Sequence, residues 1–481
     1  MTLEDIYLLP VDQQVLRLKS QAPELPPYEL LKAQWNPKDH DVFNTDKRPD
    51  KATKKKVIDS TGAEAEVRAM EPVTRIGIPF QRIIVQRAVG FLLGNPVKAK
   101  RYIEDDDKQQ VTLADMIDIT LDDNKAKYFD RKLARTVKSQ CQAAELWYVV
   151  EDPKFWQKRK SVTGTIPKYK IRCTLLSPST GDKLFPYFDE TGDMVAFSRE
   201  YILKDGEKKV THLDTWTADL VIKRSLVDGV WTEDRTPNQL RKIPVIYYSQ
   251  PEPDWGTVQT MIDRYEKKIS NFGDTNDYFG SPMVKVKGTI KSLPEKTTSG
   301  KVIQMDADSD ASYMSWDQSP ESEKLEFELL YKMIHAMTQT PTISFAEMQA
   351  IGGEMSGFAI KLLFADAHMK AENDIELFGE MYQRRLNLLK FILGSVLKPD
   401  LDAAVDTLQV EPEFTPYLPK NVKETVDILA VARGNKALIS RETALENNPL
   451  VGDIETELQR MQADADAEAE QMQKELTGSY E

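Results

Sequence analysis

One long helical pattern, from about Ser356 to Leu393, most strongly limits what this chain can fold into. At a rise of 1.5 Å per residue, a helix of that length would span roughly 55 Å. Helices this long are uncommon in compact domains and are more typical of assemblies whose elements cross a large particle. Gly379 lies within the pattern, and Gly394 and Pro399 close it. The pattern therefore favours a mainly helical protein of the kind found in large assemblies.

Between about Lys168 and Tyr248 the apolar residues change from a helical period to a period of two. Turns separate the short runs at Thr191-Gly192-Asp193, Asp205-Gly206 and Asp228-Gly229. Asp-Gly between alternating apolar runs is the strongest short-range signal for a β-hairpin. The sequence thus predicts an α+β protein with a β-rich subdomain inserted into a helical chain. It disfavours the βαβ series of a doubly wound nucleotide-binding fold.

The first part of the chain combines a loosely organised beginning with two predicted helices. Residues 1–70 are rich in proline and charge, and they include the basic run Lys54-Lys55-Lys56. That run suits either a solvated loop or a contact with phosphate or an acidic partner. Apolar residues then recur at helical spacing up to Phe91, before Gly94-Asn95-Pro96 turns the chain. Another helix is predicted from about Leu113 to Leu146, with a strand after it.

Two further helices flank a short β-like segment. The first carries a single apolar stripe, because its apolar residues step by 4, 3, 4 and 3 along the chain. The stripe consists of Val258, Ile262, Tyr265, Ile269 and Phe272. The second helix starts at Ser319-Pro320, has Leu329 and Met333 on its apolar face, and stops at Thr340-Pro341. The stripe needs an apolar partner, which either the same chain or a neighbouring copy could supply.

The stretch 350–361, "AIGGEMSGFAIK", raises the question of a phosphate-binding loop. A Walker loop needs G-x-x-x-x-G-K-[ST], so that backbone N–H groups cradle phosphates while the lysine reaches the outer ones. Gly352 and Gly357 have this spacing, but Phe358 and Ala359 stand where the Lys and the Ser or Thr are needed. No Lys or Arg lies between residues 340 and 360, and two glutamates there would repel a triphosphate. The residues disfavour a nucleotide site.

A hinge is the prediction that remains for this stretch. Gly352 and Gly353 can take backbone angles that are closed to other residues, so the loop before them can move. Ser356 can cap the long helix, and Gly357 lies in its first turn. A simple tight turn is the alternative.

Other catalytic signals are weak. The four histidines are scattered, with no pair at i and i+4 that could form a helical zinc site. Cys141 and Cys173 are the two cysteines, which is too few for a disulfide framework and favours a reducing compartment. No nucleophile and base can be recognised together. The sequence therefore predicts a protein that is not an enzyme and needs no cofactor or metal.

Composition limits the partners. No apolar run approaches the roughly 18 residues of a membrane span, so no membrane role is predicted. The chain has 64 Lys and Arg against 77 Asp and Glu, a net charge of −13. Overall acidity counts against a protein that grips DNA phosphates tightly, because tight binding needs a basic face. It is compatible with a protein past which DNA slides.

Four stretches resemble the portal proteins of tailed double-stranded DNA phages, in particular the family typical of siphophages. "IPFQRIIVQRAVGFLLGNPV" (78–97) is similar to the family's early helix, and "LRKIPVIYYSQPEPD" (240–254) to the strand before its stem. "GEMSGFAIKLLF" (353–364) is similar to the start of its long helix, and "ISRETALENNPLVGDIETELQRMQAD" (439–464) to its C-terminal segment. The motifs are loose, but they follow one another in the family's order and cover most of the chain.

The resemblance implies a portal fold. In the family, twelve subunits form a ring at one capsid vertex, and DNA passes along the ring axis during packaging and ejection. It also implies a division of the chain into named parts. These are a wing (1–253), a first stem helix (254–280), a clip (281–319), a second stem helix (320–340), a channel loop (341–355), a long wing helix (356–395), and a helical crown with an acidic tail (396–481).

The same resemblance implies roles for particular residues. The channel loop would present Ser344, Glu347, Gln349, Gly352, Gly353 and Glu354 to DNA. Lys285, Lys287 and Lys291 in the clip are candidates to face DNA or a partner, and a solvated strand face is the alternative.

The expected partners are other copies of the chain, double-stranded DNA, the terminase large subunit, a head–tail adaptor, and the major capsid and scaffolding proteins. Assembly would take place in the cytoplasm of the bacterial host and end in the virion. Two other functions stay open: a different ring-forming assembly protein of a phage or mobile element, and an enzyme that uses the Gly352–Gly357 loop.

Overall fold

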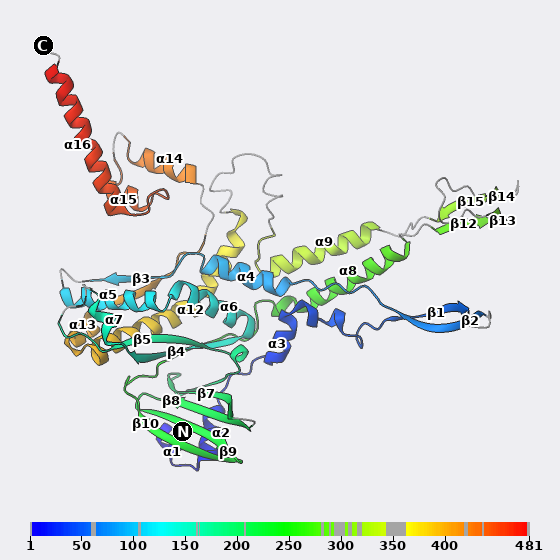
Figure 1. Ribbon diagram of the computed structural model, residues 1–481, viewed down its shortest axis with the longest axis horizontal. Helices are drawn as coiled ribbons and strands as arrows, with labels where there is room; N and C mark the ends of the chain where they lie inside the picture. The colour runs from blue at the N-terminus through cyan, green and yellow to red at the C-terminus, as the bar shows by residue number, and fades with distance from the viewer. Residues whose placement is uncertain are drawn as a thin grey trace. The chain divides into compact units, whose positions relative to one another are not determined.

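A computed structural model gives the architecture of the chain (Figure 1). It describes residues 2–58, 64–103, 107–159, 162, 164–205, 208–279, 283–287, 290–292, 304–305, 310–314, 320–342, 362–417, 422–434 and 437–478. The chain divides into two units. The first unit is Met1–Thr342 with Ala367–Pro416, and the second is Ile343–Asp366 with Tyr417–Glu481.

Helices and a three-stranded sheet share the main core of the first unit. The helices are α3 (Tyr28–Trp35), α4 (Phe80–Leu92), α5 (Lys108–Asp123), α6 (Ala126–Gln140), the short α7 (Pro153–Gln157) and α12 (Ala365–Phe391). The antiparallel sheet has the order β11-β4-β5, with β4 (Gln142–Glu151), β5 (Tyr169–Leu176) and β11 (Val245–Ser249). Ile84, Leu133, Val137, Tyr248 and Leu389 are among the residues buried between them.

The predicted helix over 113–146 is wrong, because the structure has two helices and the start of a strand there. Asp107 caps α5 by accepting hydrogen bonds from the N–H groups of Gln109 and Gln110. Lys125 then takes a left-handed conformation (φ 53°) that separates α5 from α6. Cys141, also left-handed (φ 64°), ends α6 and leads directly into β4. Periodicity alone does not mark such breaks, since neither residue is a glycine or a proline.

The β-rich subdomain is confirmed as a five-stranded antiparallel meander. Its strands are β6 (Lys183–Phe188), β7 (Met194–Asp205), β8 (Lys208–Trp216), β9 (Leu220–Val227) and β10 (Val230–Pro237), in the order β10-β9-β8-β7-β6. Asp228 and Gly229 both have positive φ (47° and 83°), as a type I′ hairpin requires. Phe197 and Trp216 pack one face of this sheet toward Tyr247 of β11.

The N-terminal residues are more ordered than the sequence suggested. Helices α1 (Leu3–Tyr7) and α2 (Val11–Lys19) cover the other face of the meander, where Ile6 and Leu18 pack against Tyr187 and Ala196. Further along, β1 (Lys51–Ile58) and β2 (Glu64–Glu71) pair as an antiparallel ribbon, and the basic run Lys54-Lys55-Lys56 lies on β1. The prediction of a loosely organised beginning is therefore wrong. Its cause is the density of prolines and charges, which hid short helices that are stabilised by tertiary packing.

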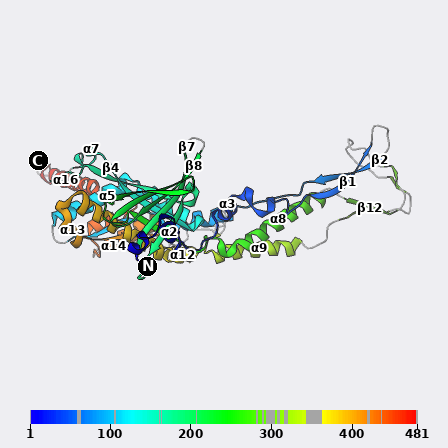
Figure 2. The same ribbon diagram turned by 90° about the horizontal axis from the view of Figure 1, so that it is seen from below.

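Helices α8 (Gln259–Phe279) and α9 (Pro320–Met337) lie side by side, as Figures 1 and 2 both show. Between them in sequence lie short strands. β12 (Met283–Lys287) pairs with β15 (Asp310–Met314), and β13 (Ile290–Ser292) pairs with β14 (Gln304–Met305). The predicted order of helix, β segment and helix is thus confirmed.

Helix α12 is long, with 27 residues that span about 40 Å. It continues without a break through Gly379, and a π-helical turn at Ile392–Leu397 follows it. The predicted start of this helix at Ser356 lies outside the described residues. After a turn at Pro399–Leu401, α13 (Asp402–Thr407) leads to β16 (Gln409–Glu413), which pairs with β3 (Lys98–Tyr102). Residues up to Pro416 therefore belong to the first unit, although the sequence placed a C-terminal region from residue 396.

The second unit contains α14 (Val422–Ala432), α15 (Arg441–Glu446) and α16 (Ile454–Gly478). Ser440 caps α15, since its side chain accepts a hydrogen bond from the N–H of Thr443 at 3.0 Å. Helix α16 continues to Gly478, so the acidic segment from Asp464 is helical. Together the two units form a mixed α+β chain.

Candidate functional site at the base of the helix pair

Helices α8 and α9 contact one another through aromatic rings and ion pairs. Tyr265 and Phe272 of α8 both meet Phe327 of α9 edge-on, with ring centroids 5.6 Å and 5.9 Å apart. Glu326 of α9 pairs with Lys268 and Arg264 of α8, at 2.8 Å in each case. The apolar stripe predicted for α8 therefore finds much of its partner surface within the same chain.

The exposure of the apolar side chains predicted to pack differs along the two helices. Val258 and Ile262 are fully buried in the main core, and Ile269 is half-buried. On α9, Met333 is half-buried, whereas Leu329 is 54% exposed. Packing within the chain thus accounts for the base of the helix pair. It does not account for Leu329, which was expected to pack.

A buried histidine and glutamate join the N-terminal segment to α8. His40 Nδ1 lies 2.7 Å from Glu266 Oε1, and His40 Nε2 lies 2.7 Å from the carbonyl oxygen of Gln34. Both ring nitrogens face acceptors, and this arrangement favours the charged imidazole, in which both nitrogens donate. Burial alone would lower the pKa of His40, but the hydrogen bond to Glu266, the charge of Glu266 and the hydrogen bond to Gln34 together outweigh it, and the pKa is raised. Glu266 also accepts the N–H of Ile78 at 2.7 Å.

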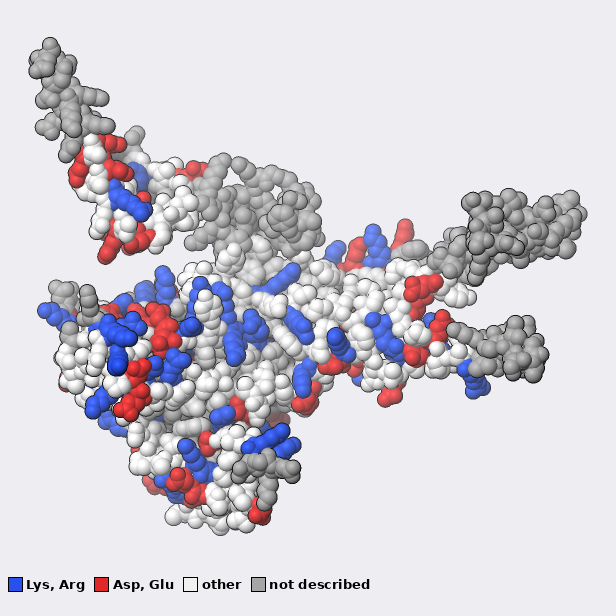
Figure 3. All heavy atoms as spheres, in the orientation of Figure 1, with Lys and Arg blue, Asp and Glu red and all other residues white. Residues whose placement is uncertain are grey.

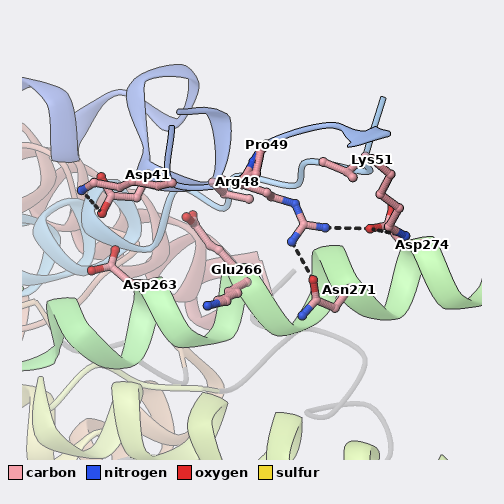
Figure 4. A pocket seen from close by; sticks show the side chains of 12 residues that line it. Asp41, Arg48, Pro49, Lys51, Asp263, Glu266, Asn271 and Asp274 are labelled. Carbon is pink, nitrogen blue, oxygen red and sulfur yellow. Dashed lines mark hydrogen bonds and ion pairs between the residues drawn. The ribbon is translucent and has the colours of Figure 1, made fainter. Parts of the chain in front are cut away.

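A second polar contact attaches the base of the β1–β2 ribbon to α8. Arg48 donates to Asn271 Oδ1 at 2.6 Å and to Asp274 Oδ2 at 2.9 Å, and Thr74 N–H donates to Asp274 Oδ1 at 2.6 Å. Figure 4 shows Arg48 reaching across to these two side chains of α8. Beside this contact is a pocket of about 440 Å³, with Asp41, Lys47, Arg48, Asp263, Glu266 and Lys267 among its lining residues.

Four charged side chains form what we call the Lys370 cluster: Lys138, Asp254, Lys370 and Asp374. Lys138 Nζ lies 3.2 Å from Asp254 Oδ2 and 2.7 Å from Asp374 Oδ1, and Lys370 Nζ lies 3.1 Å from Asp254 Oδ2. Lys138 is 1% exposed and Asp254 is 6% exposed. Burial opposes ionisation of Asp254, but the two ammonium groups outweigh it and lower its pKa.

A second buried group, the Arg385 cluster, holds α12 against β4 and α6. Arg385 donates from Nε and Nη2 to Glu145, and its Nη1 lies 2.8 Å from Asp130 Oδ1. Glu145 also accepts hydrogen bonds from Tyr248 Oη at 2.6 Å and from Trp147 Nε1 at 2.8 Å. Burial raises the pKa of Asp130 to about 6 even beside the guanidinium. The three charged side chains are at most 5% exposed.

Comparison with known proteins identifies the family. The sequence matches the phage portal proteins of the SPP1 Gp6-like type over residues 24–471, which is nearly the whole chain. The chain belongs to this family of phage portal proteins. It is therefore a structural component of a phage particle, as the sequence motifs suggested. No curated protein sequence matches it.

Two solved structures resemble the portal chain distantly. One is from the neck of an empty GTA particle computed with C6 symmetry, with a TM-score of 0.40 and 8% identity, over 76% of this chain and 87% of that chain. The other is from the neck of a native GTA particle computed with C12 symmetry, with a TM-score of 0.39 and 9% identity over the same shares. Likeness at this level carries no argument about the portal chain.

The other residues predicted from the portal resemblance fall mostly outside the described parts of the chain. The channel-loop and hinge residues Ser344, Glu347, Gln349, Gly352, Gly353, Glu354, Ser356 and Gly357 lie outside the described residues. Lys285 and Lys287 lie on β12, opposite Ser312 and Asp310 of β15, and Lys291 lies on β13. Lys287 is exposed.

The thiols and the remaining core histidine are packing residues. Burial raises the pKa of Cys141 to about 12 and also raises that of Cys173, so both stay protonated. His335 is 3% exposed, and burial lowers its pKa. Within the described parts of the chain, no cluster of His, Cys, Asp and Glu could hold a metal ion. None of the described helices is long and apolar enough to cross a membrane.

The sequence analysis missed the charged residues at the base of the helix pair. His40 and Glu266 are 226 positions apart, and Lys138 and Asp374 are 236 apart. One signal was present: Asp254 ends the stretch 240–254 that resembled the family's strand before the stem. A charge at a predicted junction was a reason to look for a buried partner there.

Proposed function

We propose that this portal protein assembles into a closed ring, a dodecamer, at one vertex of the capsid. Double-stranded DNA then passes along the ring axis during packaging and ejection. The family match over residues 24–471 carries this proposal. In it, α8 and α9 are the stem, the strands between them are the clip, and the 341–355 segment is the channel loop. Helix α12 is the long wing helix, and the second unit from Tyr417 onward supplies the crown.

An unpartnered row of apolar side chains on α9 supports contact with a neighbouring copy. Leu325 is 65% exposed, Leu329 is 54% exposed and Met337 is 60% exposed. Leu325 and Leu329 are four residues apart and therefore lie on the same side of the helix. Burying them against the next subunit would remove apolar surface from water, and head-to-tail contacts of this kind generate rings.

Charge complements this row. On α9, Glu321 and Glu328 are exposed, and on α8, Lys267 is exposed, as is Arg264 beside its pair with Glu326. If α8 of one copy faces α9 of the next, acidic and basic side chains meet around the leucines. On the face shown in Figure 3, charges of both signs are intermixed over the part that carries these helices.

The charge of the chain also supports a channel that DNA can slide through. A net charge of −13 leaves few firm phosphate contacts, and each such contact would add salt-dependent affinity and slow translocation. The terminase large subunit and later the head–tail adaptor would dock at the clip, where Lys285, Lys287 and Lys291 are candidate contacts. The major capsid and scaffolding proteins would surround the wing.

Mass photometry tests the ring. We expect the wild-type chain to form a large closed oligomer, and Leu325→Asp with Leu329→Asp to remain a folded monomer. Ile202→Asp with Leu203→Asp is the matched control, because it changes two exposed apolar residues of β7, at 57% and 52% exposure. A wild-type chain that stays monomeric across salt and protein concentration would refute the ring.

A packaging assay tests the hinge at residues 352–353. Gly352→Pro with Gly353→Pro should leave ring assembly intact and reduce the DNA packaged per head, because proline fixes φ. Normal packaging in this variant would leave the glycines as a simple turn.

A further inference from the structure

Helices α8 and α9 with the strands between them form one excursion that leaves the body of the first unit and returns to it. The chain leaves at Asp254, just before the short helical turn Gly256–Val258 that precedes α8. It returns at Thr338, directly after α9. The contacts that join these two points therefore determine the angle between the helix pair and the body of the first unit.

One ammonium group contacts both points. Lys370 Nζ lies 3.1 Å from Asp254 Oδ2, and it donates to the carbonyl oxygen of Thr338 at 3.2 Å. Lys370 comes from α12, near the start of that helix. Of the other two members of the cluster, Lys138 contacts both Asp254 and Asp374, and Lys370 is the member that also reaches Thr338.

The turn after α9 directs the carbonyl group of Thr338 toward Lys370. Gln339 is left-handed (φ 51°), and Thr340 N–H donates to the carbonyl of His335 at 2.8 Å, so the chain folds back on the last turn of the helix. Thr338 is 4% exposed. A cation at a helix C-terminus is favoured by the partial negative charge of the unpaired carbonyls.

A second cation holds the next residues of the same segment. Arg87 of α4 donates from Nη1 to the carbonyl oxygen of Pro341. The backbone after α9 is therefore tied to α4 and α12 by two side chains. Residues 343–361, which include the segment proposed as the channel loop, follow directly.

We propose that Lys370 is the positioning residue of the stem: it fixes the start of α8 and the end of α9 to α12. This inference rests on the proposed function, because only in a portal does the angle of the helix pair determine the channel. Lys370 does not touch DNA in this scheme. It acts through Asp254 and Thr338.

Asp374→Asn is the matched control for Lys370→Met. Both substitutions remove one ion pair of the same buried cluster, so both should lower stability. Only Lys370→Met removes the ammonium group from the Thr338 carbonyl, which would keep one neutral hydrogen bond, from the Thr340 hydroxyl at 3.3 Å. Lys370→Arg keeps a cation that can still reach two acceptors, and it should restore the wild-type behaviour.

Hydrogen exchange of the full-length chain gives the first readout. In Lys370→Met, amides of residues 334–342 should exchange about ten-fold faster or more, because a charged hydrogen bond to this turn is lost. In Asp374→Asn and Lys370→Arg they should exchange at the wild-type rate. Equal acceleration in Lys370→Met and Asp374→Asn would reduce Lys370 to a general stabilising residue and overturn the proposal.

The DNA packaged per assembled head gives the second readout and separates the two proposals. We expect Lys370→Met rings to form normally and to package less DNA than Asp374→Asn rings. If wild-type rings package DNA and the two variants do so equally well, the positioning role is wrong and the portal function stands. If the wild-type chain forms no ring, the portal function fails, and the exchange result alone decides the role of Lys370.

Discussion

Replacing Arg385 with methionine tests whether the Arg385 cluster is the main attachment of α12 to the body. The substitution keeps an unbranched apolar side chain in place of the aliphatic part of Arg385 and removes the guanidinium that faces both Glu145 and Asp130. Glu145 is 0% exposed, and it would keep two neutral donors, Tyr248 Oη and Trp147 Nε1. Removing one partner of a buried ion pair typically costs about 3–5 kcal/mol, because the other charge stays buried without compensation. We expect a loss in this range near neutral pH.

The sign of the pH dependence follows from the same geometry. Burial already raises the pKa of Asp130 to about 6 in the wild-type chain, and loss of the cation raises it further. The folded variant then binds a proton that the unfolded chain releases, so its stability increases as the pH falls through the raised pKa. The difference between variant and wild type should be smaller near pH 5 than near pH 8.

Urea unfolding followed by circular dichroism measures the effect. The Leu325→Asp, Leu329→Asp background should be used throughout, because ring assembly would otherwise add to the apparent stability. Arg384→Met is the control: Arg384 is the next residue on α12, it is 45% exposed, and it pairs with Glu380 at i and i+4. An exposed pair of this kind contributes about 0.3–0.5 kcal/mol. Equal losses in the two variants, or a loss in Arg385→Met that does not depend on pH, would refute the reasoning.

Three further outcomes can be measured on the same chain. Gly394→Ala should lower the free energy of unfolding in urea by about 1–3 kcal/mol, because the added Cβ would lie 2.2 Å from Val405 Cγ2. Gly90→Ala on α4 is the control: its Cβ would meet nothing within 4 Å, and the free energy of unfolding should rise by about 0.5–1 kcal/mol. Because the pKa of His40 is raised, its pair with Glu266 stabilises the fold fully below the pKa of a free histidine, about 6.5. This stabilisation is lost as the pH rises through the raised pKa, so the Tm of the wild type should fall relative to that of His40→Gln with rising pH. Ser440→Ala should weaken the cap of α15 by about 1 kcal/mol, seen as faster amide exchange in residues 441–446.

Local signals predicted the local structure well. Asp228-Gly229 gave a hairpin because the two residues supply the positive φ values that a tight β-turn needs. The stripe from Val258 gave α8, and Pro320 marked the first residue of α9. In each case the few residues that determine the conformation are neighbours in sequence, so their physical effect can be inferred without knowledge of the fold.

Long-range attachments could not be predicted in this way. Glu145 and Arg385 are 240 positions apart, and nothing near either residue indicates that it is buried. The separation of α5 from α6 depends on Lys125, which has no intrinsic preference for a left-handed conformation and takes it because both helices pack on the core. The short N-terminal helices likewise depend on the sheet that they cover.

The positions of the buried charges suggest why a portal chain keeps them. Two apolar surfaces can shift against one another at little cost in free energy, because the hydrophobic effect does not depend on direction. An ion pair with hydrogen bonds is strong only when donor and acceptor keep one relative geometry. Replacing a complete buried ion pair with apolar residues is often neutral for stability. The His40–Glu266 pair and the Lys370 cluster lie at the base of α8 and α9, where a small change of angle is amplified along the length of the helices. We therefore expect Lys370→Met combined with Asp254→Leu to lose little stability in urea and still to show fast exchange after α9. Wild-type exchange in that double variant would mean that apolar packing alone fixes the angle.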